Sequence, residues 1–252
     1  MKARIYKNID LVRIPIKSGV SEYFFPQNVA WADKKVDEVI VCAPTAACID
    51  PVDGTTQVMT DTAISDCFFN LYAADDTELT HDMSFEQIAM QNNNRLEVRS
   101  KLNLSLSKLY FTSAPVGNYT LLIYVAYDSK EVEDYDVPTR SRTVVFPMAA
   151  NEEISLRYIM STYIHNIPEK LRGLMVWNAD TVPAYLTLRD YELTYNIREL
   201  HTEMCRPDMN GGNAELSQAQ PMWFNNLNID FDYSHIRNAQ NAAVTQTITF
   251  LY

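Results

Sequence analysis

Two stretches of the chain decide its fold. Residues 102–127 read LNLSLSKLYFTSAPVGNYTLLIYVAY, and residues 227–252 read LNIDFDYSHIRNAQNAAVTQTITFLY. Aligned without a gap, they are identical at six positions, among them Thr120/Thr245 and Ile123/Ile248. Each stretch predicts two β-strands joined by a polar, turn-rich loop, because apolar and β-branched residues recur at every second position around that loop. We expect this hairpin to close each of two related domains.

Earlier segments of the two halves match in the same order. VRIPI at residues 12–16 corresponds to VVFPM at residues 144–148, and VDEVIVCA at residues 36–43 corresponds to LRGLMVWN at residues 171–178. Matching segments that follow one another in the same order in both halves indicate an internal repeat. The sequence therefore predicts an all-β protein of two tandem β-sandwich domains, jelly-roll or immunoglobulin-like, that arose by internal duplication. We place the domains at residues 1–127 and 141–252, with an acidic linker at residues 128–140.

One short helix is expected within this β-rich chain. Residues 82–91 (DMSFEQIAMQ) place Ser84 at a capping position and put Phe85, Ile88 and Ala89 on one face. Residues 154–163 fit either a strand or a helix, because their apolar residues satisfy both spacings. We expect one helix, at residues 82–91, and do not choose between strand and helix for residues 154–163.

Composition excludes several classes of function. The 252 residues carry a formal net charge of -11, which argues against nucleic-acid binding because phosphate neutralisation needs clustered Lys and Arg. No apolar run is long enough to span a bilayer, so we expect no membrane association. The first residues lack the apolar core of a signal peptide, so synthesis and folding are expected in the cytoplasm. All four cysteines are therefore expected to be unpaired, Cys42 and Cys67 as small core residues.

No catalytic or cofactor motif stands out. The four histidines lie in separate segments, and there is no nucleophile elbow or glycine-rich phosphate loop. Acidic turns at residues 50–54 and 75–78 could supply calcium ligands, but their spacing fits no EF-hand, so turn-forming roles are favoured. No pair of carboxylates is singled out for glycosidase chemistry. We expect no enzymatic activity, no cofactor and no metal.

Two aromatic clusters and a basic segment are the candidate contact residues. The clusters can be ordinary core or anchors of a protein interface, where Tyr, Trp and Phe are enriched. The amino-terminal segment can be basic by chance or can dock on an acidic neighbour. The candidate protein-contact residues are Lys2, Arg4, Lys7, Tyr23, Phe24, Phe25, Trp223 and Phe224.

The tandem LNLSLSKLYF and LNIDFDYSHI units, with the proline-bearing VRIPI and VVFPM strands, carry a resemblance. In these features the chain resembles virion structural proteins of crAss-like phages, in particular head auxiliary (decoration) proteins. The resemblance implies many copies bound to a capsid shell, with other virion proteins as partners, the major capsid protein among them, and possible self-association. It implies location in the virion and a role in assembly or stability.

Other functions are also compatible with this sequence. A sandwich with aromatic residues on its loops can serve as a host-surface or glycan-binding module. A neck or tail component of a virion is a further alternative, and an enzyme such as a glycosidase is the third. Purified protein on a glycan array would separate glycan binding from a shell role.

Overall fold

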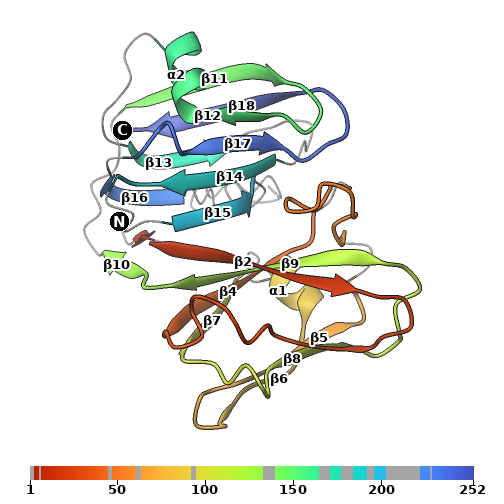
Figure 1. The fold of residues 1–252 in the computed structure, drawn as a ribbon. Helices are drawn as coiled ribbons and strands as arrows, with labels where there is room; N and C mark the ends of the chain where they lie inside the picture. Colours follow the sequence, from red (N-terminus) through yellow and green to blue (C-terminus); the bar gives the residue numbers. More distant parts are fainter. Residues whose placement is uncertain are drawn as a thin grey trace. The chain divides into compact units, whose positions relative to one another are not determined.

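The computed structural model describes residues 3–5, 7–44, 47–60, 64–91, 95–132, 140–164, 171–176, 184–191, 196–202, 222–227 and 229–252 (Figure 1). The chain divides into two compact units. We call residues 8–128 the first sandwich, and residues 129–252 together with residues 1–7 the second sandwich. Each is described by itself.

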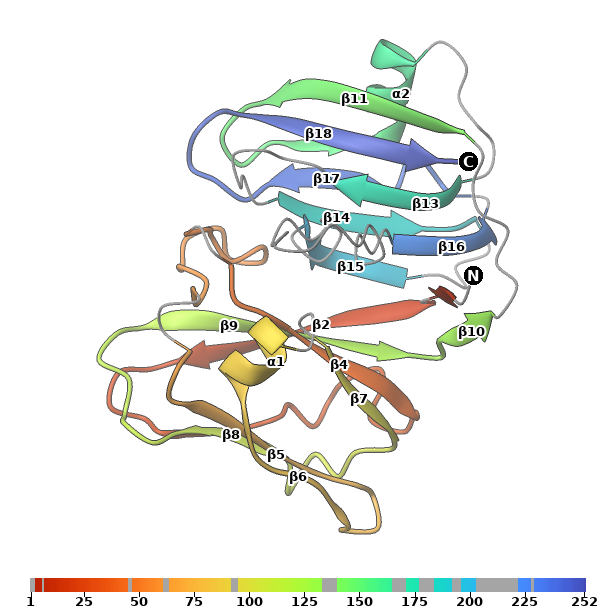
Figure 2. The same cartoon turned by 180° about the vertical axis from the view of Figure 1, so that it is seen from behind.

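The first sandwich consists of two layers of antiparallel strands (Figure 2). In one layer the pairing order is β2-β9-β4-β7, and in the other it is β3-β8-β5-β6. The strand bounds of the first layer are β2 Asn8–Ile16, β9 Tyr119–Tyr127, β4 Val36–Cys42 and β7 Arg95–Ser100. Those of the second layer are β3 Glu22–Phe24, β8 Lys108–Phe111, β5 Cys67–Tyr72 and β6 Glu78–Ser84.

The second sandwich repeats this order strand for strand. Its layers pair as β11-β18-β13-β16 and as β12-β17-β14-β15. The first layer has bounds β11 Ser141–Met148, β18 Val244–Leu251, β13 Leu171–Val176 and β16 Met222–Leu227. The second layer has bounds β12 Glu153–Ser155, β17 His235–Asn238, β14 Ala184–Arg189 and β15 Asn196–His201. Eight strands in this order form a jelly roll, so the immunoglobulin-like alternative is wrong and the jelly-roll alternative is confirmed.

The register of pairing is also the same in both sandwiches. Pro15 lies opposite Thr120 in the first, and Pro147 lies opposite Thr245 in the second. Val41 lies opposite Ile123, as Val176 lies opposite Ile248. Both prolines occupy strands, β2 and β11, that pair within their own sandwich with a single neighbour, so the missing N–H leaves that ladder intact. The proline-strand match in the sequence is thus confirmed position by position.

A buried serine repeats with its hydrogen bonds. The hydroxyl of Ser107 accepts the N–H of Tyr72 at 3.0 Å, and the hydroxyl of Ser234 accepts the N–H of Arg189 at 3.0 Å. Both serines are completely buried. Each hydroxyl ties the turn before β8 or β17 to the end of β5 or β14, where an unpaired buried N–H would be costly.

This serine pair corrects the gapless alignment. Ser107 and Ser234 are 127 positions apart, whereas Thr120 and Thr245 are 125 apart. The loop from β8 to β9 is therefore two residues longer than the loop from β17 to β18. The alignment without a gap is right for the last strand of each sandwich and wrong for the preceding strand.

The core of the first sandwich explains why its strands form. Apolar residues on alternate positions of β5 and β8 point inward, and the nine-residue β9 is buried almost throughout. Phe69 stacks on Phe85 of helix α1 (Phe85–Gln91) with ring centroids 5.6 Å apart, and Phe25 lies 6.4 Å from Phe69. Trp31 is 1% exposed in the same core. Burial of these large rings is the main source of stability here.

The structure contains a second helix, in the segment that fitted both a strand and a helix. Helix α2 (Leu156–Tyr163) begins after Ser155, whose side chain accepts the N–H of Tyr158, and it buries Leu156, Ile159 and Met160. The preceding residues form strand β12 instead. The predicted short helix is therefore confirmed as α1, and α2 lies in the segment that the sequence left open between strand and helix. The segment satisfied both spacings because it is a strand followed by a helix.

The amino-terminal segment and the predicted linker are paired with each other. Strand β1 (Ala3–Ile5) is antiparallel to β10 (Lys130–Val132), with Arg4 opposite Glu131. The proposed docking arm is part of a strand, and the rest of the predicted linker, residues 133–139, lies outside the described residues.

Candidate interaction surfaces

The first predicted aromatic cluster is divided between three environments. The Tyr23 hydroxyl accepts the N–H of Lys17 at 2.8 Å and lies 3.0 Å from the Val20 carbonyl, so it holds the loop between β2 and β3. Phe25 is 2% exposed and belongs to the core, which removes it from the contact surface. Phe24 is 54% exposed. Alternation along β3 explains the split, since neighbouring strand residues face opposite sides.

The remaining predicted contact residues are only partly placed. Trp223 and Phe224 lie in β16 and Arg4 lies in β1, but their side chains are outside the described part of the chain. Lys2 lies outside the described residues, and Lys7 is exposed.

The outer face of the β3-β8-β5-β6 layer carries aromatic rings and paired charges. Phe68 and Tyr110 stack with centroids 5.6 Å apart. Lys108 binds Glu22 at 2.9 Å, and Nδ1 of His81 lies 2.7 Å from Glu78. The hydrogen bond that the ring donates to Glu78, and the charge of Asp82, raise the pKa of His81. A hydrogen bond to Asp82 raises the pKa of Tyr110 to about 12, ahead of a smaller effect of burial. The face is a polar-aromatic platform whose charged groups already have partners.

A second exposed cluster, missed from the sequence, lies at one end of the second sandwich. We define the tyrosine–arginine cluster as Tyr158, Tyr191, Tyr233, Arg157 and Arg189. The three tyrosines are 55%, 57% and 64% exposed. The Arg157 N–H donates to the Phe231 carbonyl at 3.0 Å, which brings the start of α2 to the turn before β17.

Its two arginines interact with two of the three tyrosines, Arg157 with Tyr191 and Arg189 with Tyr233. Nε of Arg157 binds Asp232 at 2.5 Å, and the pKa of Arg157 is raised first by that hydrogen bond and also by Tyr191. The guanidinium of Arg189 lies 5.8 Å from the ring centroid of Tyr233, within cation–π range. Tyrosine and arginine are the residues that dominate binding energy at protein interfaces. The sequence alternation at residues 227–233 had suggested a strand, whereas residues 231–233 form a turn that turns Tyr233 outward.

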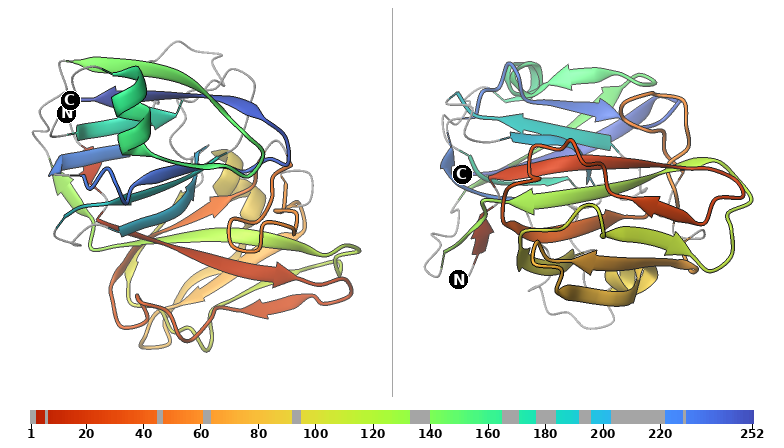
Figure 3. Two further views of the ribbon diagram at one scale, coloured as in Figure 1. Left: turned by 45° about the horizontal axis from the view of Figure 1, so that its top comes forward. Right: turned by 60° about the horizontal axis from the view of Figure 1, so that its bottom comes forward.

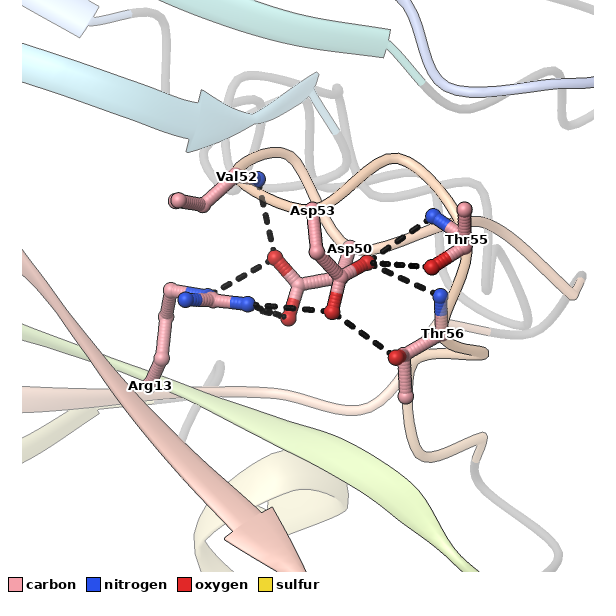
Figure 4. A network of polar contacts seen from close by, with 6 residues as sticks. All are labelled: Arg13, Asp50, Val52, Asp53, Thr55 and Thr56. Carbon is pink, nitrogen blue, oxygen red and sulfur yellow. Dashed lines mark hydrogen bonds and ion pairs between the residues drawn. The ribbon is translucent and has the colours of Figure 1, made fainter.

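The acidic loop at residues 49–58 is held by Arg13 (Figure 4). Nε of Arg13 donates to Asp50 at 2.7 Å, and its terminal nitrogen lies 3.3 Å from Asp53. The Asp50 side chain is fully buried, and it also accepts the Val52 N–H at 2.8 Å. Asp53 caps the turn by accepting from Thr55 and Thr56. Although burial raises it, the pKa of Asp53 falls to about 2 because of these hydrogen bonds and the charge of Arg13.

This network favours the turn-forming role over calcium binding. The carboxylates face a guanidinium and turn N–H groups, and among the described residues no group of three or more His, Cys, Asp or Glu could hold a metal. Beside the network lies a pocket of about 280 Å³ with Arg13, Lys17, Asp53 and Tyr119 in its lining. Within its lining, Asp53 binds both Arg13 and Thr56.

Three of the four cysteines are placed. Cys42, Cys48 and Cys67 are buried and form no disulfide bond, as expected, and Cys205 lies outside the described residues. Burial raises the pKa of the Cys67 thiol to about 12. In the described part of the chain, no helix is long and apolar enough to cross a membrane.

Comparisons with known proteins assign no family to this chain. No protein-family model matches the sequence, and no curated protein matches it. Among solved structures, a chain from "Life in the extremes: atomic structure of Sulfolobus Turreted Icosahedral Virus" is similar with a TM-score of 0.25 and 9% identity. That similarity covers 98% of this chain and 90% of the other. The chain is therefore assigned here by its strand order, as a protein of two tandem jelly rolls.

Proposed function

We propose that this chain is a structural protein of a virion and acts through protein–protein contacts in or on a capsid shell. The observation that carries the proposal is the occurrence of two jelly rolls with the same strand order and register. Jelly rolls recur in viral capsid proteins and in lectins. Because one fold hosts many functions, this support is an analogy and calls for a direct test.

The exposed side chains suit such contacts. The tyrosine–arginine cluster offers large rings with few rotatable bonds, as protein-binding surfaces do. The proposal includes no enzymatic activity and no cofactor. An auxiliary (decoration) position, the major capsid protein as partner and a crAss-like phage as source are its narrower forms.

We also propose that the two sandwiches arose by duplication of one jelly-roll gene segment. The repeated serine bridge and the repeated proline register support a common origin, because fold physics alone does not require the same residue at both places. The helices differ in position, α1 following β6 and α2 following β12. Such differences are what separate divergence of the two copies would produce.

Self-assembly of the purified protein tests the shell role. Sedimentation velocity from low to high micromolar concentration, followed by negative-stain electron microscopy, should show large regular assemblies if the chain builds a shell. A decoration protein should instead stay small alone and co-sediment with preformed shells. The proposal would be contradicted if the protein neither assembled by itself nor bound to preformed capsid shells.

Glycan binding is the second candidate. It is favoured by the exposed rings of Tyr158, Tyr191 and Tyr233, since sugars stack on exposed aromatic faces and jelly rolls occur in lectins. Specific binding on a glycan array that is lost in Tyr233→Ala would support this candidate.

A further inference from the structure

Strands β12, β17, β14 and β15 form one layer of the second sandwich, drawn as a ribbon in Figure 3. The pairing register places several titratable residues on one side of that layer. Glu153 lies opposite Arg237, Arg237 opposite Tyr185, and Tyr185 opposite His201. In the next row His235 lies opposite Ser155 and Thr187. Residues directly opposite in antiparallel strands point to the same face. We call these side chains, together with Glu199, the histidine face.

His201 is completely buried on this face. Its ring packs edge-on against Tyr185 with centroids 5.5 Å apart. Burial alone lowers the pKa of His201 to about 3. The folded protein therefore holds a neutral imidazole here, because a buried imidazolium would lose its hydration.

His235 is surrounded by charges from three strands. Its Nε2 lies 3.4 Å from Glu153 of β12, which favours the protonated form. Burial is the larger effect and lowers the pKa of His235, and the charges of Arg237 and Arg189 lower it further. The neutral form again prevails in the folded state.

Glu199 of β15 is the remaining acid on this face. Its Oε1 lies 3.9 Å from Arg237, and burial raises its pKa against the effect of that arginine. Because the folded pKa of Glu199 is raised, its effect on stability is opposite to that of the histidines. Protonation of Glu199 in acid removes the cost of burying its negative charge and so stabilises the fold. Two histidines against one glutamate leave a net acid sensitivity between pH 6.5 and the carboxylate range.

The first sandwich lacks this arrangement at the matching positions. Its registers place Ser84 where the second sandwich has His201, and Lys108 where it has His235. The histidine of that layer, His81, is 70% exposed and bound to Glu78. Its pKa is raised, so acid strengthens its ion pair.

We propose that the histidine face makes the second sandwich an acid-sensitive unit, which opens when His201 and His235 take up protons, while the first sandwich stays closed. The sign follows from linkage. When the pKa of a histidine is lower in the folded state, the unfolded state takes up the proton first. The free energy of unfolding is therefore highest above about pH 6.5 and falls as the pH drops towards the pKa of the folded state. Opening is confined to one unit because the other carries no buried histidine among its described residues.

Hydrogen exchange read by mass spectrometry on the full chain tests this at pH 7.4, 6.0 and 5.0, with rates corrected for intrinsic exchange. Protection of peptides from β14, β15 and β17 should fall about tenfold per pH unit for each proton taken up below pH 6.5. Peptides from β5, β6 and β8 should keep their protection. His201→Phe combined with His235→Gln should remove the pH dependence.

His81→Gln is the matched control, and it should leave the pH dependence of the second sandwich unchanged. Equal loss of protection in both sandwiches would overturn the proposal, as would an unchanged slope in the double variant. If His201→Phe does not fold, His235→Gln alone decides: a shallower slope supports the proposal and an unchanged slope overturns it. None of these outcomes depends on whether the protein assembles into a shell.

Discussion

Asp50 illustrates how a single loop residue acquires a structural role. Its carboxylate is fully buried and binds Arg13, whose side chain is 31% exposed. A buried charge without its partner is costly, and breaking such a pair destabilises proteins by about 3–5 kcal/mol. Because Arg13 is partly hydrated and also contacts Asp53, the lower end of that range applies.

We therefore predict that Asp50→Ala lowers the free energy of unfolding by about 3 kcal/mol, measured by urea denaturation. The matched control is Asp33→Ala, which breaks the Lys101–Asp33 pair, also a close contact at 2.8 Å but with Asp33 91% exposed. That change should leave the free energy of unfolding nearly unchanged, because water and salt screen an exposed pair. Equal effects of the two substitutions would show that burial of Asp50 is not what matters.

The buried cysteines lead to a chemical prediction. The thiolate is the reactive form, and at pH 8 a thiol with a pKa of about 12 is almost entirely protonated. Native protein treated with iodoacetamide should remain unlabelled at Cys42, Cys48 and Cys67, and urea without reductant should expose all of them to labelling. Peptide mapping checks this, and a labelled Cys67 in the native state would contradict its burial.

At the scale of elements, the serine bridge is the most informative repeat. Ser107 and Ser234 each connect the turn before one strand to the end of another through a buried hydroxyl. The strands β8 and β17 are short, so their position depends on this tie as well as on ladder hydrogen bonds.

Ser107→Ala and Ser234→Ala should each destabilise the protein by about 1–3 kcal/mol, because each leaves a buried N–H without its acceptor. Differential scanning calorimetry at fixed pH measures the shift. Ser105→Ala is the control, since Ser105 is exposed two residues away and should be nearly neutral. A large effect in one sandwich and none in the other would argue against equivalent roles.

The whole molecule carries a net charge of -11, so copies repel one another. Salt screens such repulsion over about 10 Å at 0.1 M. If copies associate as proposed, raising NaCl from 20 to 200 mM should strengthen association, measured by sedimentation velocity. Weaker association in salt would mean that complementary charged patches, and not apolar or aromatic contacts, hold the copies together.

The sequence by itself determined the class of fold and the presence of two halves with matching strands. Alternation of apolar residues predicts half-buried strands, and VRIPI and VVFPM marked equivalent strands whose registers agree. Helix α1 was also predictable, because helix capping and helical periodicity depend only on residues close together in the sequence. The jelly-roll order itself was one of two alternatives, since strand pairing is a long-range property.

Only the tertiary structure decided which faces are buried and which side chains meet. Phe24 and Phe25 are adjacent in the sequence, yet one is 54% exposed and the other is core. His201 is buried on the side of its strand that faces away from Leu200 and the sandwich core, which alternation alone predicts to be exposed. The tyrosine–arginine cluster joins α2, the end of β14 and the turn before β17. Burial depends on what packs against a face, and residues far apart in the chain supply that packing.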